Sequence, residues 1–121
     1  MTDRGNPAEG QLSASRSELV RYAAATRDWN PIHWDHNSAV AAGLPGVVVH
    51  GLLQGSWALR HATLGTQGDR PLAAARIRFR SPLLPANPVT VTSNHDGSTM
   101  TISLSDGESE YITTRVELAD E

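Results

Sequence analysis

The stretch Asp28-Trp29-Asn30-Pro31-Ile32-His33-Trp34-Asp35 sets how the rest of this 121-residue chain is arranged. Pro31 fixes its own backbone torsion and disfavours the helical conformation at Asn30, whose side chain readily bonds its own backbone. The sequence therefore predicts a rigid bend flanked by Asp28 and His33. A carboxylate and an imidazole held in this way suit general acid-base catalysis, because histidine titrates near neutral pH. The alternative is an Asx-type turn with an incidental histidine.

A helix is predicted immediately before this bend. Ser15 and Glu18 form the S-x-x-E pattern of a capping box, in which a hydroxyl caps the helix start and a glutamate reaches back. The apolar spacing continues to about Thr26, so the end of this helix should deliver Asp28 into the bend.

A second, shorter helix is predicted after the bend, followed by a strand. Asp35 or Asn37 can cap the helix start, and Gly43 would end it in the left-handed conformation. The residues expected to face inward are Ala39, Val40 and Ala42. Residues 47–49 are three consecutive valines, which predict a short strand buried on both faces.

The next element is predicted to be a buried central helix from about Leu52 to Thr63, stopping at Gly65. Its apolar residues are too widely spread around the helix for a surface position; they are Leu52, Leu53, Trp57, Leu59 and Leu64. Neither His50 nor Gly51 is a strong side-chain cap, so the backbone N–H groups at the start need another acceptor. Gly55, one turn into the helix, indicates close packing or room for a ligand.

The remainder of the chain is predicted to be an antiparallel meander. The four expected strands are Leu72–Arg80, Val89–His95, Thr99–Ser105 and Glu110–Leu118. Asp-Gly pairs at 96–97 and 106–107 are hairpin signals, so the last three strands should pair in sequence. With a strand near residues 11–14 and the valine strand, the prediction is one α+β domain over residues 11–121, with an antiparallel sheet of about five strands around the central helix. Residues 1–10 are predicted to be a disordered lead.

Composition narrows the functional classes. The chain has no cysteine, which excludes disulfides, thiolate metal sites and cysteine nucleophiles. The net charge of −3 and the absence of lysine argue against nucleic acid as a partner. No apolar run is long enough to cross a membrane, and the first dozen residues lack the apolar core of a secretion signal. We therefore expect a cytoplasmic protein.

The chain resembles the MaoC-like dehydratases, the R-specific enoyl-CoA hydratases with a hot-dog fold. Asp28-x-Asn30-Pro31-x-His33 stands in the family's D-x-N-P-x-H motif, and Val49-His50-Gly51-Leu52-Leu53 is similar to the segment that opens the central helix. Phe79-x-x-Pro82 is the weakest part of the match. Three residues depart from the pattern: Arg27 stands where a glycine commonly precedes the aspartate, Trp34 is bulkier than the usual aliphatic residue, and Asn87 stands near the place of a usual glycine.

The resemblance implies a hydratase or dehydratase of lipid metabolism, such as fatty-acid or steroid side-chain metabolism, that acts on trans-2-enoyl thioesters. Asp28 and His33 would deprotonate the attacking water and return a proton to C2, and the Gly51 N–H at the helix start would receive the enolate charge. No metal or redox cofactor is implied, since coenzyme A is part of the substrate. The candidate substrate contacts are Asn30, His50, Ser56, Trp57, Arg76 and Arg78.

Several alternatives stay open. The arginines at 76 and 78 can hold the phosphates of coenzyme A or form a solvated strand face, and His50 is either a ligand contact or a packed histidine. The pattern His33-x-Asp35-His36 allows a metal interpretation, although Asp35 has a simpler role as a helix cap. The whole chain is alternatively a hot-dog acyl-CoA thioesterase or a non-catalytic partner subunit. The expected assembly is a homodimer, or a heteromer with a second hot-dog chain, acting on an acyl-CoA or acyl-carrier thioester.

Overall fold

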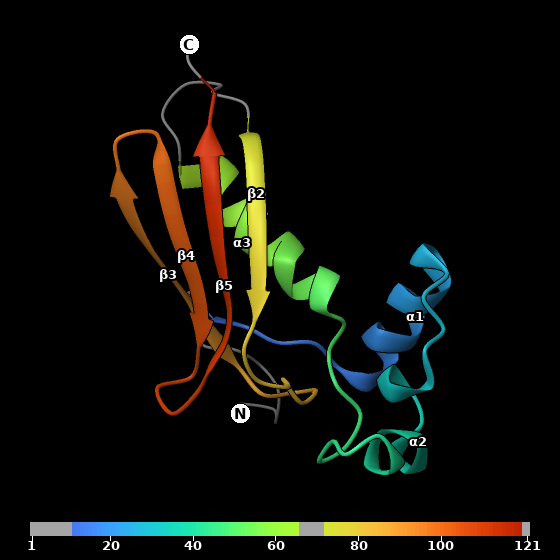
Figure 1. The fold of residues 1–121 in the computed structure, drawn as a ribbon. Helices are drawn as coiled ribbons and strands as arrows, with labels where there is room; N and C mark the ends of the chain where they lie inside the picture. The colour runs from blue at the N-terminus through green and yellow to red at the C-terminus, as the bar shows by residue number, and fades with distance from the viewer. Residues whose placement is uncertain (1–10, 66–71, 120–121) are drawn as a thin grey trace, which may run out of the picture. The chain divides into compact units, whose positions relative to one another are not determined.

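A computed structural model describes residues 11–65 and 72–119, so the lead predicted at residues 1–10 lies outside the described residues. The chain forms two compact units. Of the described residues, one unit comprises 11–53 and 82–89, and the other comprises 54–65, 72–81 and 90–119. Figure 1 shows the helices α1 and α2 of the first unit and the β-sheet of the second.

The first unit begins with the two-residue strand β1 (Gln11–Leu12) and helix α1 (Arg16–Thr26). The predicted capping box is present: the Ser15 hydroxyl accepts from the Glu18 N–H, and the Glu18 carboxylate accepts from the Ser15 N–H. Leu19 and Ala23 are the buried residues of α1. The helix ends at Arg27, which has a left-handed backbone with φ of 60°.

A 3-10 turn, η1 (Pro31–His33), leads into helix α2 (His36–Ala41). Asp35 caps α2 by accepting from the Ser38 N–H, and Gly43 follows the helix with φ of 89°, so both predicted boundaries are confirmed. The prediction of its inward face holds only for Ala39, because Val40 is 50% exposed and Ala42 is also exposed. Residue 40 points about 100° away from residue 39 on a helix, and only the Ala39 side of α2 is turned inward. Ala42 is the C-cap and follows the last residue of α2.

The strand predicted at residues 47–49 is not formed, although all three valines are buried. The Val48 N–H donates to the Ile32 carbonyl at 3.0 Å, whereas the Val49 N–H donates to the Leu83 carbonyl at 2.8 Å. These bonds go to two different segments, so no ladder with a single neighbour develops. β-branched residues here satisfy burial in an extended connection between α2 and α3.

The second unit holds four of the five strands: β2 (Leu72–Phe79), β3 (Val89–Asp96, all but its first residue), β4 (Thr99–Ser105) and β5 (Glu110–Leu118). Their order is β3-β4-β5-β2, and every pair is antiparallel. Gly97 and Gly107 have φ of 62° and 90°, as the predicted Asp-Gly turns require. The pairing of the last three strands in sequence is confirmed.

Helix α3 (Gly51–Gly65) lies behind the sheet in Figure 1. The prediction that its large apolar residues are buried is only partly right, since Leu52 is 65% exposed while Leu53, Trp57 and Leu59 are half-buried. Its buried residues are mostly small: Gln54, Gly55, Ala58 and Ala62. A Cβ on Gly55 would lie 2.5 Å from Ile77 Cδ1 of β2, so close packing explains this glycine. Small side chains let the helix approach the strands.

The helices within residues 11–65 and 72–119 are all too short or too polar to span a bilayer.

Candidate functional site

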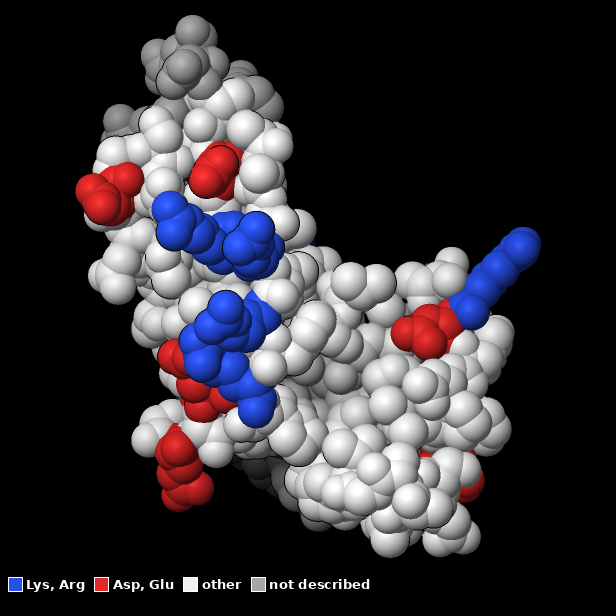
Figure 2. All heavy atoms as spheres, in the orientation of Figure 1, with Lys and Arg blue, Asp and Glu red and all other residues white. Residues whose placement is uncertain are grey.

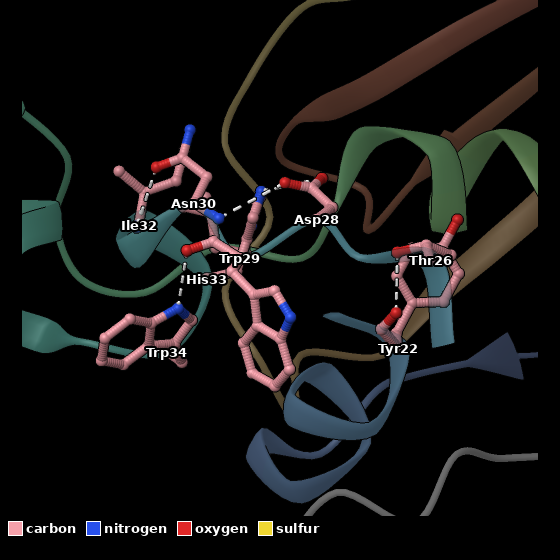
Figure 3. A network of polar contacts seen from close by, with 9 residues as sticks. Tyr22, Thr26, Asp28, Trp29, Asn30, Ile32, His33 and Trp34 are labelled. Atoms are coloured by element: carbon pink, nitrogen blue, oxygen red, sulfur yellow. Dashed lines mark hydrogen bonds and ion pairs between the residues drawn. The ribbon is translucent and has the colours of Figure 1, made fainter. Parts of the chain in front are cut away.

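The bend after α1 orients the Asp28 carboxylate through local hydrogen bonds. Asp28 Oδ1 accepts from the Asn30 N–H at 3.4 Å, and Asn30 Oδ1 accepts from the Ile32 N–H at 3.3 Å (Figure 3). Pro31 occupies the first position of η1, where its missing N–H costs nothing. The predicted Asx-type bend is therefore present, and it leaves Asp28 Oδ2 free to face His33.

His33 is held in one orientation and one tautomer. Its Nδ1 lies 2.8 Å from the Val48 carbonyl oxygen, and since a carbonyl only accepts, Nδ1 carries the proton. In the neutral ring, Nε2 is then an acceptor, and it lies 3.9 Å from Asp28 Oδ2. The His33 side chain is 9% exposed and that of Asp28 is 44% exposed. The pair thus joins a buried imidazole to a carboxylate that solvent reaches.

His50 lies directly against this pair. Its ring stacks on His33 with centroids 3.8 Å apart and planes 19° apart, and it is 1% exposed. Neither ring nitrogen has a hydrogen-bond partner of ordinary geometry. Burial lowers the pKa of His50, and His33 lowers it further, while the carbonyl and carboxylate of Asp28 act in the opposite direction. The Asp28 carbonyl does not meet hydrogen-bond geometry with the His50 ring, so its effect on this pKa is electrostatic. His50 is therefore a neutral ring near pH 7.

Tyr22, on α1, lies beside the site and was not among the site residues predicted from the sequence. Its ring meets that of His50 at 4.7 Å with a 58° tilt. Burial raises the pKa of Tyr22, and the Asp28 charge raises it further. The only sequence signal for this role is that Tyr22 lies about one turn before the end of the helix that delivers Asp28.

The first unit brings together several of the predicted site residues. Asp28, His33 and His50 converge, and α3 begins at Gly51, the residue after His50. Asn30 lies in the same bend, but its side-chain oxygen caps η1. The remaining candidates belong to the second unit, where Ser56, Arg76 and Arg78 are exposed and Trp57 is half-buried.

Basic side chains gather over β2 and β5 of the second unit, as Figure 2 shows. Arg76 on β2 pairs in register with Arg115 on β5, and both line a pocket of about 270 Å³ together with Ala74, Ala75 and Glu117. Like charges directly opposite one another are unfavourable unless an anion lies between them. Arg80 differs, because its Nε bonds Glu110 at 2.8 Å.

The prediction that His33, Asp35 and His36 could together bind a metal is wrong, because they are not the residues that lie together. The Asp35 carboxylate is engaged in capping α2, where it accepts from the Ser38 N–H and hydroxyl. Within the described residues, the set of side chains able to surround one ion is instead Asp28, His33 and His50.

Comparison with known proteins identifies one family that matches nearly the whole chain and two relatives that match part of it. The family described as MaoC like domain matches residues 2–117. A mitochondrial 3-hydroxyacyl-acyl-carrier-protein dehydratase of Arabidopsis thaliana is 35% identical over 69 residues, 57% of this chain and 41% of that protein. The fatty acid synthase beta subunit pkiC of Emericella nidulans is 33% identical over 79 residues, 63% of this chain and 4% of that subunit. The chain therefore spans less than half the length of either relative.

Solved structures share the fold over nearly the whole chain. The ChsH1-ChsH2 complex from Mycobacterium tuberculosis matches with a TM-score of 0.76 and 25% identity, covering 92% of this chain and 91% of that chain. The (R)-hydratase from A. caviae involved in PHA biosynthesis matches with a TM-score of 0.64 and 25% identity, covering 98% of both chains. These matches confirm the predicted α+β hot-dog class.

Proposed function

Because the chain belongs to the MaoC-like domain family, we propose that it adds water to a trans-2-enoyl thioester, giving an (R)-3-hydroxyacyl thioester, or catalyses the reverse dehydration. The observation that carries this proposal is the approach of Asp28 Oδ2 to His33 Nε2 at 3.9 Å. The gap is too long for a direct hydrogen bond and suits one water molecule bonded to both atoms at about 2.8 Å each.

In this mechanism, Asp28 and His33 share the bridging water. Both present acceptors, because the His33 proton is on Nδ1 and is donated to Val48. The water donates one hydrogen to each, which aims its oxygen at C3 of the substrate. As the C3–O bond forms, one of the pair takes a proton from the water, and that same residue then delivers this proton to C2. The product carries the hydroxyl on C3 and the new hydrogen on C2.

The thioester oxygen gathers negative charge during this step. We assign its stabilisation to the Gly51 N–H, because α3 starts there and the positive end of the helix dipole favours an anion. Losing such a donor typically costs about 2.7 to 4 kcal/mol of transition-state stabilisation. Gly51 also follows His50 directly, which ties the helix start to the ring stacked on His33.

We further propose that the thioester is carried by coenzyme A and that Arg76 and Arg78, with Arg115, hold its phosphates. The registered pair Arg76 and Arg115 supports this, since an anion between them would relieve their repulsion. A carrier-protein thioester is the other candidate form of the substrate. No metal or redox cofactor takes part in the proposed chemistry.

The proposed assembly is a dimer. Strand β2 ends the strand order and pairs with β5, and an edge strand can pair with a second chain. The partner is either a second copy or a related chain; a chain similar to this one was solved as part of the ChsH1-ChsH2 complex. Molecular mass in solution, measured for the chain alone and after co-expression with a related chain, distinguishes these assemblies.

The function is tested by the loss of conjugated enoyl absorbance when the purified chain is mixed with enoyl-CoA thioesters of increasing length. Asp28→Asn and His33→Ala should each lower kcat by roughly 10²- to 10⁴-fold. The matched controls are Asp96→Asn and His95→Ala, exposed residues at the end of β3, which should leave turnover unchanged.

Unchanged hydration in Asp28→Asn and His33→Ala would remove the catalytic assignment from this chain. Release of free thiol from saturated acyl-CoA, without hydration of the enoyl thioester, would identify a thioesterase instead.

A further inference from the structure

Three side chains of residue types that can ligate a metal converge in the first unit. Asp28, His33 and His50 each offer one ligand atom, and these atoms all lie within 4.8 Å of one another. They come from three segments: the end of α1, the turn η1 and the residue before α3. Two imidazoles and a carboxylate are a donor set that zinc uses, with a fourth position left for water.

His50 supplies an independent sign that a ligand belongs here. The ring is 1% exposed, and both of its nitrogens lack a hydrogen-bond partner. A buried polar group without a partner typically costs about 1 to 3 kcal/mol. An apolar ring would fill this position equally well. A ligand bound to one nitrogen of His50 would remove the cost of the missing hydrogen bond.

His33 is already arranged as a metal ligand would be. Histidines that bind metals usually donate their other ring N–H to a carbonyl or carboxylate, which fixes the tautomer. The bond from His33 Nδ1 to the Val48 carbonyl at 2.8 Å does this, and it leaves the Nε2 lone pair directed toward Asp28.

We propose that Asp28, His33 and His50 bind a divalent transition-metal ion, zinc above all, and that a bound ion displaces the water used in hydration. The imidazole donors favour zinc over magnesium or calcium, which prefer oxygen ligands. The binding step stands on the geometry alone, while the displacement of water rests on the proposed function. The ion is an exchangeable inhibitor, and the reaction itself needs none.

Binding requires the Asp28 carboxylate to rotate and the His50 ring, which is 1% exposed and also packs against Tyr22, to tilt. In tetrahedral zinc with bonds of about 2.0 to 2.2 Å, neighbouring ligand atoms lie about 3.4 Å apart. Asp28 Oδ2 and His33 Nε2 are at 3.9 Å, and the half-exposed Asp28 side chain can close that gap by rotation. A metal lies in the plane of each imidazole that binds it, so His50 must tilt out of its near-parallel stack on His33. His50 has no hydrogen bond to break in doing so.

The test is a titration of the metal-free, tag-free chain with Co²⁺, whose visible absorption reports its ligands, followed by displacement with Zn²⁺. We expect one Co²⁺ per chain with the intense bands of a four-coordinate ion, lost on addition of Zn²⁺. His50→Gln and Asp28→Asn should each weaken binding by more than the roughly 10- to 100-fold that loss of an outer partner costs.

The matched control is His95→Gln, an exposed histidine on β3, which should bind as the wild type does. Two single variants, His50→Gln and Asp28→Asn, are compared so that a folding defect in one of them does not decide the result. Far-ultraviolet circular dichroism verifies that each variant is folded. Equal Co²⁺ affinity in the wild type and both variants, or no saturable binding by the wild type at millimolar Co²⁺, would overturn the site.

The second measurement is turnover. Zn²⁺ should abolish hydration at the concentrations that displace Co²⁺, and a chelator should restore it. Stoichiometric Zn²⁺ binding with unchanged turnover would overturn the displacement of water and leave the metal site standing. A chain without hydratase activity would refute the proposed function, and the spectroscopic titration would still decide the metal site.

Discussion

The imidazole rings of His33 and His50 stack with centroids 3.8 Å apart. His33 is restrained in two ways: by the Val48 carbonyl at Nδ1 and by the His50 ring on one face. In the proposed reaction, a general base that is already oriented before substrate arrives loses little freedom. The stack is therefore part of the candidate site, and a nitrogen of each ring lies within 4.8 Å of an Asp28 carboxylate oxygen.

Acid should destabilise the chain through His50. Burial lowers its pKa in the folded state, so the unfolded chain binds more protons as the pH falls through about 6.5. The stability that depends on a neutral, buried His50 is fully present above that pH and is lost as the pH falls below it. In metal-free buffer, the free energy of unfolding should fall less steeply between neutral and mildly acidic pH in His50→Phe than in the wild type. His95→Gln keeps His50 and should keep the wild-type slope; an equal slope in His50→Phe would contradict the prediction.

Tyr22 should ionise above the pKa of free tyrosine, about 10, because burial and the Asp28 charge both raise its pKa. The chain has two tyrosines, so the titration of Tyr22 is the difference between the wild-type and Tyr22→Phe ultraviolet titrations. Asp28→Asn should lower the Tyr22 pKa without returning it to the free value, since burial is the larger cause. An unchanged Tyr22 titration in Asp28→Asn would show that the Asp28 charge does not act on the Tyr22 hydroxyl.

Gly55 and Ile77 should be energetically coupled. A methyl group at 55 gains about 1 kcal/mol of helix propensity, but it would lie 2.5 Å from Ile77 Cδ1. Ile77→Val removes that atom. The change in unfolding free energy caused by Gly55→Ala should therefore be more favourable in the Ile77→Val background, by at least ~0.5 kcal/mol. Denaturant unfolding of the four proteins measures this, and strict additivity would exclude the contact.

Arg27 should be a site of backbone strain. It has φ of 60° at the end of α1, a conformation that favours glycine, and the family pattern commonly has glycine there. Arg27→Gly should therefore stabilise the chain by about 0.5 to 1 kcal/mol. Arg21→Gly, within α1, is the matched control and should cost about 1 kcal/mol. A loss of stability in Arg27→Gly would show that the arginine side chain matters more than the strain.

Charge reversal at Arg76 should affect binding more than chemistry. Arg76→Glu should raise KM for an enoyl-CoA thioester roughly tenfold, because a charge-assisted bond to phosphate is lost, while kcat changes little. A short thioester that lacks the nucleotide should show no such change in KM. Arg80→Ala is the control, since Arg80 bonds Glu110. An unchanged KM in Arg76→Glu would discard the arginine surface as a coenzyme A site.

Features that depend on neighbouring residues could be predicted from the sequence. The capping box at Ser15, the Asx bend around Asn30 and the Asp-Gly hairpins all arise from bonds within a few residues, so their patterns are visible without the fold. The approach of the Asp28 and His33 side chains was also predicted, because both residues flank the same short bend.

Only the tertiary structure decided what surrounds that pair. The Val48 carbonyl that orients His33 lies 15 residues away in the chain, and the His50 stack and the Tyr22 contact are equally remote. The same holds for burial: the valines at 47–49 have the composition of a strand, yet their backbone bonds go to two separate segments. Local sequence specifies which bonds are available to a residue, whereas the packed chain determines which distant partner takes them.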